Sequence, residues 1–277
     1  MLTGTARVEE LAVRAPVLAR LDAGAVVLPE AESLQVAYEI ASPHRVAMLP
    51  PALHPTDPPI VTWVVTRCPR SPWGPFAMAE TRLECRSGLR FRALLVAAVV
   101  DQPAAARALR DDFGFAVQPG EVGLRRHYDA IEARVLTAGR LVLALTVSDP
   151  DPLAPGDIQH VANLHLAHTP KGLRLVQVEP RFATRRAERG RARVTTFDGA
   201  AWGEARIVPV HPVSASLSLG EITIPPLRYL CRPDVLAFEG TEVVDPRPCL
   251  GSEASVGRSV DRAEAVPRPA KPARQNE

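Results

Sequence analysis

The sequence predicts a mainly β protein, in which a few short helices accompany an antiparallel sheet that closes or folds on itself. Leu34–Ile40 alternates apolar residues with polar or small ones, which is the period of a half-buried strand, and ten further segments are also predicted to be strands. Turn-forming pairs such as Ser87-Gly88 and Ala138-Gly139 join most of these segments at hairpin spacing. Only two or three segments have helical spacing, so a sandwich- or barrel-like architecture follows.

The N-terminal region, residues 1–33, is predicted to be helical. Apolar residues from Val8 to Leu18 recur at helical spacing, and Pro16 interrupts that pattern. We therefore expect a short, broken helix ahead of the sheet.

The β domain is predicted to span residues 34–242. Alternation from Leu34 to Ile40 indicates its first strand, and Ser42-Pro43 then indicates a short helix that runs through Met48. The other strands are expected at Ile60–Arg67, Phe76–Cys85, Leu89–Val100, Tyr128–Leu136, Gly139–Ser148, Ile158–His165, Gly172–Val178, Ala192–Phe197, Ala205–Val210 and Ser214–Ile224.

Two further segments complete the predicted organisation. An interior helix is expected over Pro103–Asp112, ended by Gly114. Residues 243–277 are rich in Pro, Arg, Ala, Glu and Ser and poor in apolar side chains, so a disordered tail is expected there.

The charge balance argues against a nucleic-acid partner. The 33 basic and 31 acidic residues leave a net charge of +2, which is too balanced for an electrostatic footprint on a polyanion. The one basic cluster, Arg185–Arg193, is interrupted by Glu188 and Gly190. We interpret it as a solvated hairpin rather than a phosphate-binding patch.

Cysteine spacing and hydropathy point to a cytoplasmic protein. The four cysteines have no CxxC spacing, and Glu9, Glu10 and Arg14 break the apolar run that a secretion signal would need. The longest uncharged apolar stretch, Ala93–Val100, is far shorter than a membrane span. No membrane partner is therefore expected.

Lysine is almost absent from the chain: Lys171 and Lys271 are its only two. Lysine is the side chain that forms Schiff bases with carbonyl substrates. Lys171 lies in a Pro-Lys-Gly hairpin turn, and Lys271 lies in the predicted tail. Neither position suits a reactive amine.

Residues 106–123 read as a helix, an exposed loop and a strand, and this order resembles the acetoacetate decarboxylase family. The resemblance covers roughly residues 34–235. It implies a closed or cone-like β-barrel, a small carbonyl or organic-acid ligand, no cofactor, lyase-type chemistry and assembly into a homo-oligomer. Its other parts are Val36-Ala37-Tyr38, Leu49-Pro50-Pro51-Ala52-Leu53, the strand entry Gly74–Glu80, Gly139-Arg140-Leu141 and Leu217–Pro225.

The resemblance also shows what this chain has lost. The family loop after the helix reads Pro-Lys-Lys-Leu-Gly, in which the first lysine condenses with a β-keto acid and the second lowers its pKa. The matching stretch here is Pro119-Gly120-Glu121-Val122-Gly123, so neither lysine is present. An iminium intermediate cannot form there.

Three other functional positions of the family have counterparts in this chain. A substrate-binding arginine after the Val-Tyr of the early strand is matched by Glu39, which inverts the charge. A glutamate on the next strand is matched by Val64, or by Trp63 or Val65 with a shift of one residue. Glu80 is the one acidic position that the match retains.

The candidate site is built around these residues. Glu80 alternates with apolar neighbours and is expected to face the barrel interior, where burial would raise its pKa for acid–base work. The alternative is a solvated face on which Glu80, Arg82 and Glu84 merely alternate. Our hypothesis is that the catalytic candidates Glu80, Glu121 and His127 share one cavity with the substrate-binding candidates Glu39, Trp63, Val64, Gly120 and Arg126.

A metal site is not expected. His160, His165 and His168 lie close in sequence, but along a strand His165 shares a face with Asn163 and the other two point away. We interpret them as sheet-surface histidines.

Two functions remain open from the sequence. One is an enzyme that uses carboxylate acid–base chemistry without a Schiff base. The other is a non-catalytic ligand-binding or structural protein that keeps the fold alone.

Overall fold

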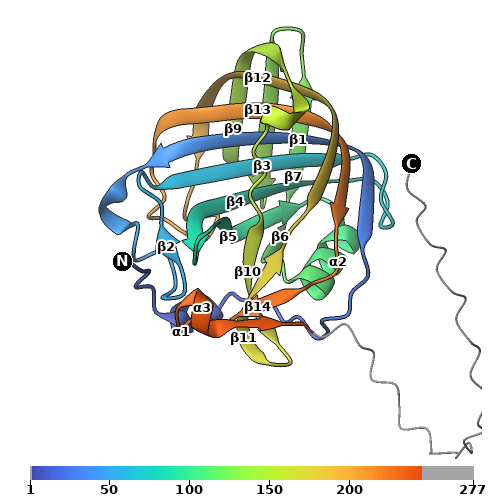
Figure 1. Cartoon of the computed structure of the whole chain (residues 1–277). Helices are drawn as coiled ribbons and strands as arrows, with labels where there is room; N and C mark the ends of the chain where they lie inside the picture. Colours follow the sequence, from blue (N-terminus) through green and yellow to red (C-terminus); the bar gives the residue numbers. More distant parts are fainter. Residues whose placement is uncertain (1, 245–277) are drawn as a thin grey trace, which may run out of the picture. The chain divides into compact units, whose positions relative to one another are not determined.

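The computed structural model describes residues 2–244, and all of them lie in Met1–Pro246, the first of two units into which the chain divides. The described residues contain one 15-stranded sheet and a few short helices, which confirms the mainly β prediction (Figure 1). The strands are β1 (Val26–Ile40), β2 (His54–Pro55), β3 (Ile60–Cys68), β4 (Phe76–Ser87), β5 (Arg90–Val100), β6 (Val117–Pro119), β7 (Glu121–Arg126), β8 (Ala130–Thr137), β9 (Arg140–Leu153), β10 (Asn163–Thr169), β11 (Gly172–Val178), β12 (Arg181–Phe197), β13 (Pro209–Ile224), β14 (Tyr229–Cys231) and β15 (Thr241–Val243).

The sheet order is β15-β14-β11-β10-β5-β4-β3-β1-β13-β12-β9-β8-β7, with β2 paired to β4 and β6 paired to β5. This order has two ends, β15 and β7, so the expected closed barrel is not confirmed. The hydrogen-bonded ladder stops at Gly120. The chain leaves its pairing with β5 at Pro119 and begins its pairing with β8 at Glu121.

The central strands are buried on both faces and therefore contribute to two apolar cores. Trp63 and Ala79 belong to the first core, and Met78 and Ala98 belong to the second. Side chains alternate between the faces of a strand. Glu80, two residues from Met78, consequently faces the second core.

Helix α2 (Pro103–Phe113) covers the second core, as the helical pattern predicted. Gln102 caps its first turn by accepting a hydrogen bond from the backbone N–H of Ala105 at 2.7 Å, and Pro103 occupies its first turn. Gly114 ends it with φ 68°, a left-handed conformation that favours glycine. Phe115 follows at once and is buried.

The N-terminal region is less helical than predicted. Helix α1 covers only Val8–Ala12, and strand β1 already begins at Val26, inside the region expected to be helical. Val26 pairs with Ile224, at the far end of β13. This partner is remote in sequence, so a local pattern could not indicate the strand.

Several other elements differ from the prediction, and β12 in particular begins at Arg181 rather than at Ala192. The helix expected through Met48 is a 3-10 turn, η1 (Ser42–His44), and β10 begins at Asn163 rather than at Ile158. Most of Ala205–Val210 lies outside any strand, because β13 starts at Pro209. The Arg185–Arg193 cluster lies inside β12 and is not a hairpin. The remaining short helices are η2 (Pro155–Asp157) and α3 (Ala237–Gly240), and residues 245–277 of the predicted tail lie outside the described part of the chain.

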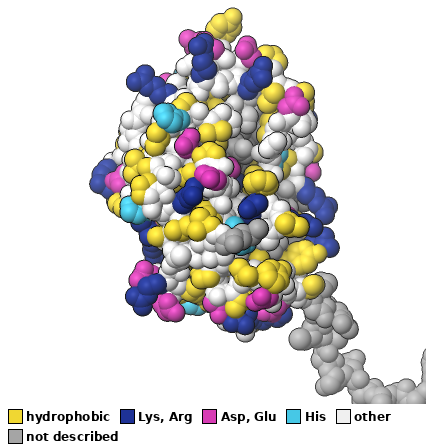
Figure 2. Space-filling model, turned by 60° about the vertical axis from the view of Figure 1, so that its left-hand side comes forward, with side chains coloured by type: hydrophobic (Ala, Val, Ile, Leu, Met, Phe, Trp, Pro, Cys, Tyr) yellow, Lys and Arg dark blue, Asp and Glu magenta, His cyan; other side chains and the backbone are white. Residues whose placement is uncertain are grey.

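Charge is dispersed over the surface. Figure 2 shows acidic and basic side chains interspersed over the face in view, without a patch of one sign. Within residues 2–244, no helix has the length and apolar character needed to cross a membrane.

Candidate functional site

Glu80 lies at the centre of a buried polar cluster on β4, and 1% of its surface is exposed. The Nε and Nη2 of Arg82 donate hydrogen bonds to its two carboxylate oxygens at 2.9 and 2.6 Å. The side-chain amide of Asn163 donates a third at 3.2 Å. The alternative of a solvated charged face is therefore wrong for Glu80. The carboxylate faces the second core, and not the face that carries Trp63.

Two residues of β10 complete the cluster. Asn163 and His165 share a face, as predicted, and each is 1% exposed. His165 packs edge-on against Phe115, with ring centroids 4.1 Å apart, and its Nδ1 lies 2.8 Å from the backbone oxygen of Phe113. Burial lowers its pKa to about 3, although the hydrogen bond to Phe113 partly opposes that effect. His165 is therefore a neutral, buried imidazole, and its interpretation as a sheet-surface residue is wrong.

Three acceptor-capable atoms at or near this cluster have no hydrogen-bond partner among the described residues. They are the Nε2 atoms of His165 and His160 and the Oδ1 of Asn163. Unpartnered polar atoms are costly in a protein interior. They mark the cluster as a place where a further polar group would be stabilised.

A groove of about 710 Å³ is lined by His160 and by Glu84, which follows Arg82 on one strand face, whereas Glu80, Arg82, Asn163 and His165 are not among its lining residues. The loop that carries His160 is held from three sides. Gln35 of β1 donates to the backbone oxygen of Gln159 at 3.1 Å, the His160 ring stacks on Phe182 at 3.6 Å, and the N–H of Ala93 donates to Ala162. Burial, and then the charge of Arg82, lower the pKa of His160 to about 4.

The predicted lysine loop has no room for a side chain at its first position. A Cβ on Gly120 would lie 2.3 Å from the backbone oxygen of Leu136 and 2.5 Å from Cγ1 of Val99. Both distances are shorter than real Cβ contacts. The β5–β8 junction thus requires glycine here, and a lysine could not be accommodated without moving the backbone.

The loop that directly follows helix α2 is not the Pro119–Gly123 stretch that the sequence predicted. Helix α2 is followed directly by Gly114, Phe115 and Ala116, whereas Pro119–Gly123 is the passage from β6 to β7. The directly following loop contains no lysine either. Phe115 contacts His165, so this loop packs against the buried cluster.

Glu121, His127 and Arg126 do not join Glu80. Glu121 and His127 are exposed and line a hollow on the β7–β8 hairpin, where His127 lies 3.9 Å from Glu132. Arg126 donates two hydrogen bonds at 2.9 Å to Glu188, and these bonds lower the pKa of that carboxyl. The hypothesis of one shared cavity is wrong because β7 turns its polar face outward.

The remaining candidates are divided between the two faces of the sheet. Val64 pairs directly with Glu80 and shares its face. Glu39 is on that face too, but it lies four residues along β1 from the partner of Val64, roughly 13 Å away. Trp63 lies on the opposite face, with its ring centroid 4.9 Å from that of Phe197.

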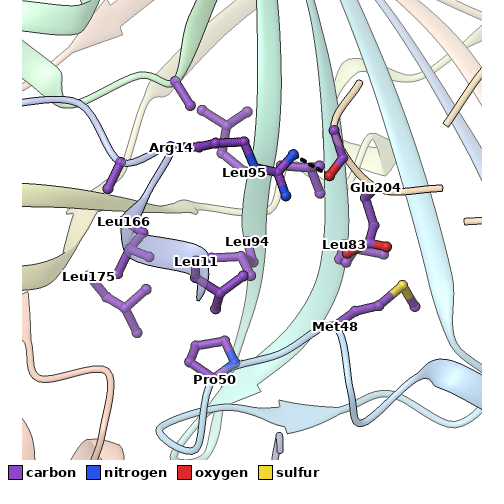
Figure 3. A pocket seen from close by; sticks show the side chains of 14 residues that line it. Leu11, Arg14, Met48, Pro50, Leu83, Leu94, Leu95, Leu166, Leu175 and Glu204 are labelled. Atoms are coloured by element: carbon purple, nitrogen blue, oxygen red, sulfur yellow. Dashed lines mark hydrogen bonds between the residues drawn. The ribbon is translucent and has the colours of Figure 1, made fainter. Parts of the chain in front are cut away.

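A small apolar cavity of about 60 Å³ lies between the N-terminal segment and the middle of β4 and β5 (Figure 3). Leucines form much of its wall, and Arg14 reaches the backbone oxygen of Gly203 beside it. Its volume is well below the roughly 300 Å³ of a typical ligand pocket. The groove lined by His160 and Glu84 is the larger space.

Sequence reasoning missed Arg82, Asn163 and His165 as site residues. The single usable signal was the shared strand face of Asn163 and His165. Nothing local indicated that Asn163 would reach Glu80, since the two are 83 residues apart and β5 lies between their strands. Among the described residues, no group of three or more His, Cys, Asp or Glu side chains could hold a metal ion.

The fold and site define a β-sheet protein with a buried carboxylate–guanidinium–imidazole cluster. The family model described as acetoacetate decarboxylase matches residues 15–231, which is well over half of the chain. The chain therefore belongs to the acetoacetate decarboxylase family. No curated protein matches it.

Solved structures of the same fold agree with this assignment. The acetoacetate decarboxylase of Legionella pneumophila is 18% identical with a TM-score of 0.66, covering 74% of this chain and 86% of that one. A second acetoacetate decarboxylase is 15% identical with a TM-score of 0.67, covering 86% and 98%. The enduracididine biosynthesis enzyme MppR, complexed with pyruvate, is 19% identical with a TM-score of 0.62, covering 74% and 90%. At these identities the likeness shows the fold.

Proposed function

We propose that this protein binds a small carbonyl or organic-acid ligand at the Glu80 cluster and acts on it by acid–base chemistry without a Schiff base. The observation that carries the proposal is the Glu80–Arg82 pair, buried beside acceptor atoms that have no partner. MppR, of similar fold, was solved with pyruvate, which supports a ligand of this class.

The missing lysines support the exclusion of an iminium. Neither Gly114–Ala116 nor Pro119–Gly123 contains a lysine. Lys171, on the β10–β11 turn, lies 3.2 Å from Glu242 in an exposed ion pair. That position is remote from the Glu80 cluster in the sheet, because it is at the other end of β10 from Asn163.

The chemistry follows from what the cluster offers. Glu80 and the neutral His165 can accept protons, and Arg82 can stabilise negative charge that develops on a carbonyl oxygen. Decarboxylation without an iminium lacks an electron sink. Proton transfer next to a carbonyl, as in hydration, dehydration, isomerisation or aldol steps, suits these groups better.

The test is exchange of hydrogen for deuterium at carbon next to a carbonyl. Pyruvate, acetone and acetoacetate are incubated with the protein in D2O, and the loss of C–H signal is followed by NMR. We expect exchange above the buffer rate, loss of it in Glu80→Gln, and retention of it in Glu239→Gln, which removes an exposed carboxylate. If Glu80→Gln fails to fold, Glu80→Asp takes its place in this comparison, and circular dichroism checks that the variant is folded.

Borohydride provides the second readout. Reduction in the presence of acetoacetate is expected to leave the mass of the protein unchanged. A trapped adduct on Lys171 would overturn the proposal, and so would exchange that Glu80→Gln leaves intact.

A non-catalytic role is the second candidate. It is favoured by the tight closure of the cluster, since the space that opens near it is a groove bounded by the 158–162 loop. In that case ligands bind without any exchange of their hydrogens.

A further inference from the structure

Two spaces meet at Arg14, which follows helix α1. We infer that they form one site for a medium-chain monocarboxylate, whose carboxylate binds Arg14 and whose hydrocarbon chain fills the small leucine-lined cavity. The inference goes beyond the proposed function and does not rest on it. Leu83 in the cavity wall belongs to the first core, and it faces the side of β4 opposite to Glu80, which lies three residues away.

A groove of about 510 Å³ adjoins the leucine-lined cavity. The two spaces share four lining residues, Arg14, Val96, Ala116 and Gly203. Figure 3 shows Arg14 and the leucines around the same cavity. Arg14 and Arg110 in the groove are exposed, and the volume of the groove falls within the range of ligand pockets. The groove therefore gives a ligand from solvent access to Arg14 and to the adjoining cavity.

Arg14 carries the free charge of this site. The residues that line the groove include Arg14 and Arg110 but no Asp or Glu. Arg110 donates to the carboxylate of Asp111 at 2.7 and 3.4 Å, which offsets much of its charge. Arg14 donates to the backbone oxygen of Gly203 and makes no ion pair within residues 2–244. One free positive charge is balanced by a monoanion, and not by a doubly charged phosphate monoester.

Glu204 lines the cavity, but it does not balance Arg14. The Nε and Nη2 of Arg206 donate to its two carboxylate oxygens at 2.6 and 2.5 Å. The Glu204 side chain is 8% exposed, so its carboxylate is held in a contact that Arg206 already fills. The charge of Arg14 is thus left for a ligand.

The cavity limits the length of the hydrocarbon chain. Leu11, Met48, Leu94 and Leu175 are among the apolar side chains of its wall, and its volume is about 60 Å³. A water-sized group needs roughly 10–15 Å³ of such a volume, so about four to six methylene groups fit. Each methylene removed from water strengthens binding by about fourfold. Affinity should therefore rise from butyrate to octanoate and then level off.

The experiment is isothermal titration calorimetry of the full chain with butyrate, hexanoate, octanoate, dodecanoate and the uncharged octan-1-ol. We expect hexanoate to bind about fifteenfold more tightly than butyrate, because it buries two more methylenes. Dodecanoate should gain nothing over octanoate. Octan-1-ol should bind at least about fivefold more weakly than octanoate, because it lacks the charge that Arg14 recognises.

Three variants locate the two ends of the ligand. Arg14→Gln should weaken octanoate binding at least about fivefold and leave octan-1-ol binding unchanged. Arg7→Gln is the matched control, since its side chain is 74% exposed on the same N-terminal segment and it should bind both ligands as the wild type does. Ala15→Leu enlarges a side chain of the cavity wall and should remove the gain from butyrate to hexanoate.

Three outcomes would overturn the inference. They are the absence of saturable binding of every acid to the wild type, equal binding of octanoate to the wild type and to Arg14→Gln, and an affinity that keeps rising by the same factor up to dodecanoate. The last result would mean that the chains bind an open apolar surface and not a cavity of fixed length. The wild-type series with acids of increasing length needs no variant to fold.

Discussion

The guanidinium of Arg82 donates two hydrogen bonds, of 2.9 and 2.6 Å, to the carboxylate of Glu80, which lies two residues away on the same strand. Their side chains are 10% and 1% exposed. A buried pair of this kind is weak evidence for stability as a whole, but each partner is costly to remove alone. The pair therefore gives a direct test of how the cluster is held together.

We expect Glu80→Leu to lower the free energy of unfolding by about 3–5 kcal/mol, because it leaves the Arg82 charge buried without its partner. The double variant Glu80→Leu/Arg82→Met should recover most of that loss. Urea denaturation measures both. Glu32→Gln is the control, since its partner Arg67 is 54% exposed and surface pairs contribute roughly 0–1 kcal/mol. Additive losses in the double variant would contradict the prediction.

The β5–β8 junction should tolerate no side chain at Gly120. Gly120→Ala is expected to cost about 1–3 kcal/mol, because its Cβ would lie 2.3 Å from the oxygen of Leu136. Gly123→Ala is the matched control on the same segment, where the nearest atom would be 3.9 Å away. Thermal unfolding compares the two. Equal melting temperatures would show that the junction can open, and that steric exclusion does not explain why no lysine stands at position 120.

Buried histidines should make the protein less stable in mild acid. Burial lowers the pKa of His165 to about 3 and that of His160 to about 4, below the ordinary 6.5 of an unfolded chain. At a pH between the folded and the unfolded pKa of each histidine, the unfolded state binds more protons than the folded state. The free energy of unfolding is therefore highest above about pH 6.5 and falls as the pH decreases. The loss approaches about 1.4 kcal/mol per pH unit for each histidine.

His165→Phe isolates this effect from carboxyl titration at lower pH. Unfolding free energies measured from pH 7 to pH 4.5 should fall less steeply in the variant than in the parent. Equal slopes would mean that His165 is charged in the folded protein.

Three cysteines should be unreactive in the native state. Burial raises the pKa of Cys68 and Cys85 to about 12 and also raises that of Cys231. Thiolate is the reactive form, so little of it is present at neutral pH. Iodoacetamide followed by peptide mass spectrometry should leave these three unmodified in native protein and should label them in urea. Labelling of Cys85 in native protein would contradict its burial.

The local pattern was sufficient for much of the fold. Helix α2 was predicted because a short helix-like stretch begins at Pro103 and ends at Gly114, and strands such as β11 were predicted because alternation and turn residues act over a few positions. Strand β1 was placed too late, and the expected closed barrel was not confirmed. Both depend on pairing between remote segments, such as Val26 with Ile224.

The candidate site was predicted only in part. Glu80 is buried as expected, yet Glu121 and His127 lie elsewhere, because strand spacing does not say which face of a sheet another strand will cover. The position of β7 depends on the junction at Gly120, where close packing against Val99 and Leu136 sets the direction of the chain.

By itself, the sequence determined the mainly β class and the scarcity of lysine, which is limited to Lys171 and Lys271, since composition and short-range periodicity need no partner. Only the tertiary structure decided that Glu80 and Arg82 meet Asn163 and His165. The physical reason is that β10 pairs with β5, whose other neighbour in the sheet is β4, so that Asn163 reaches Glu80 across the sheet. Pairing of that kind joins residues far apart in the chain, and no local spacing records it.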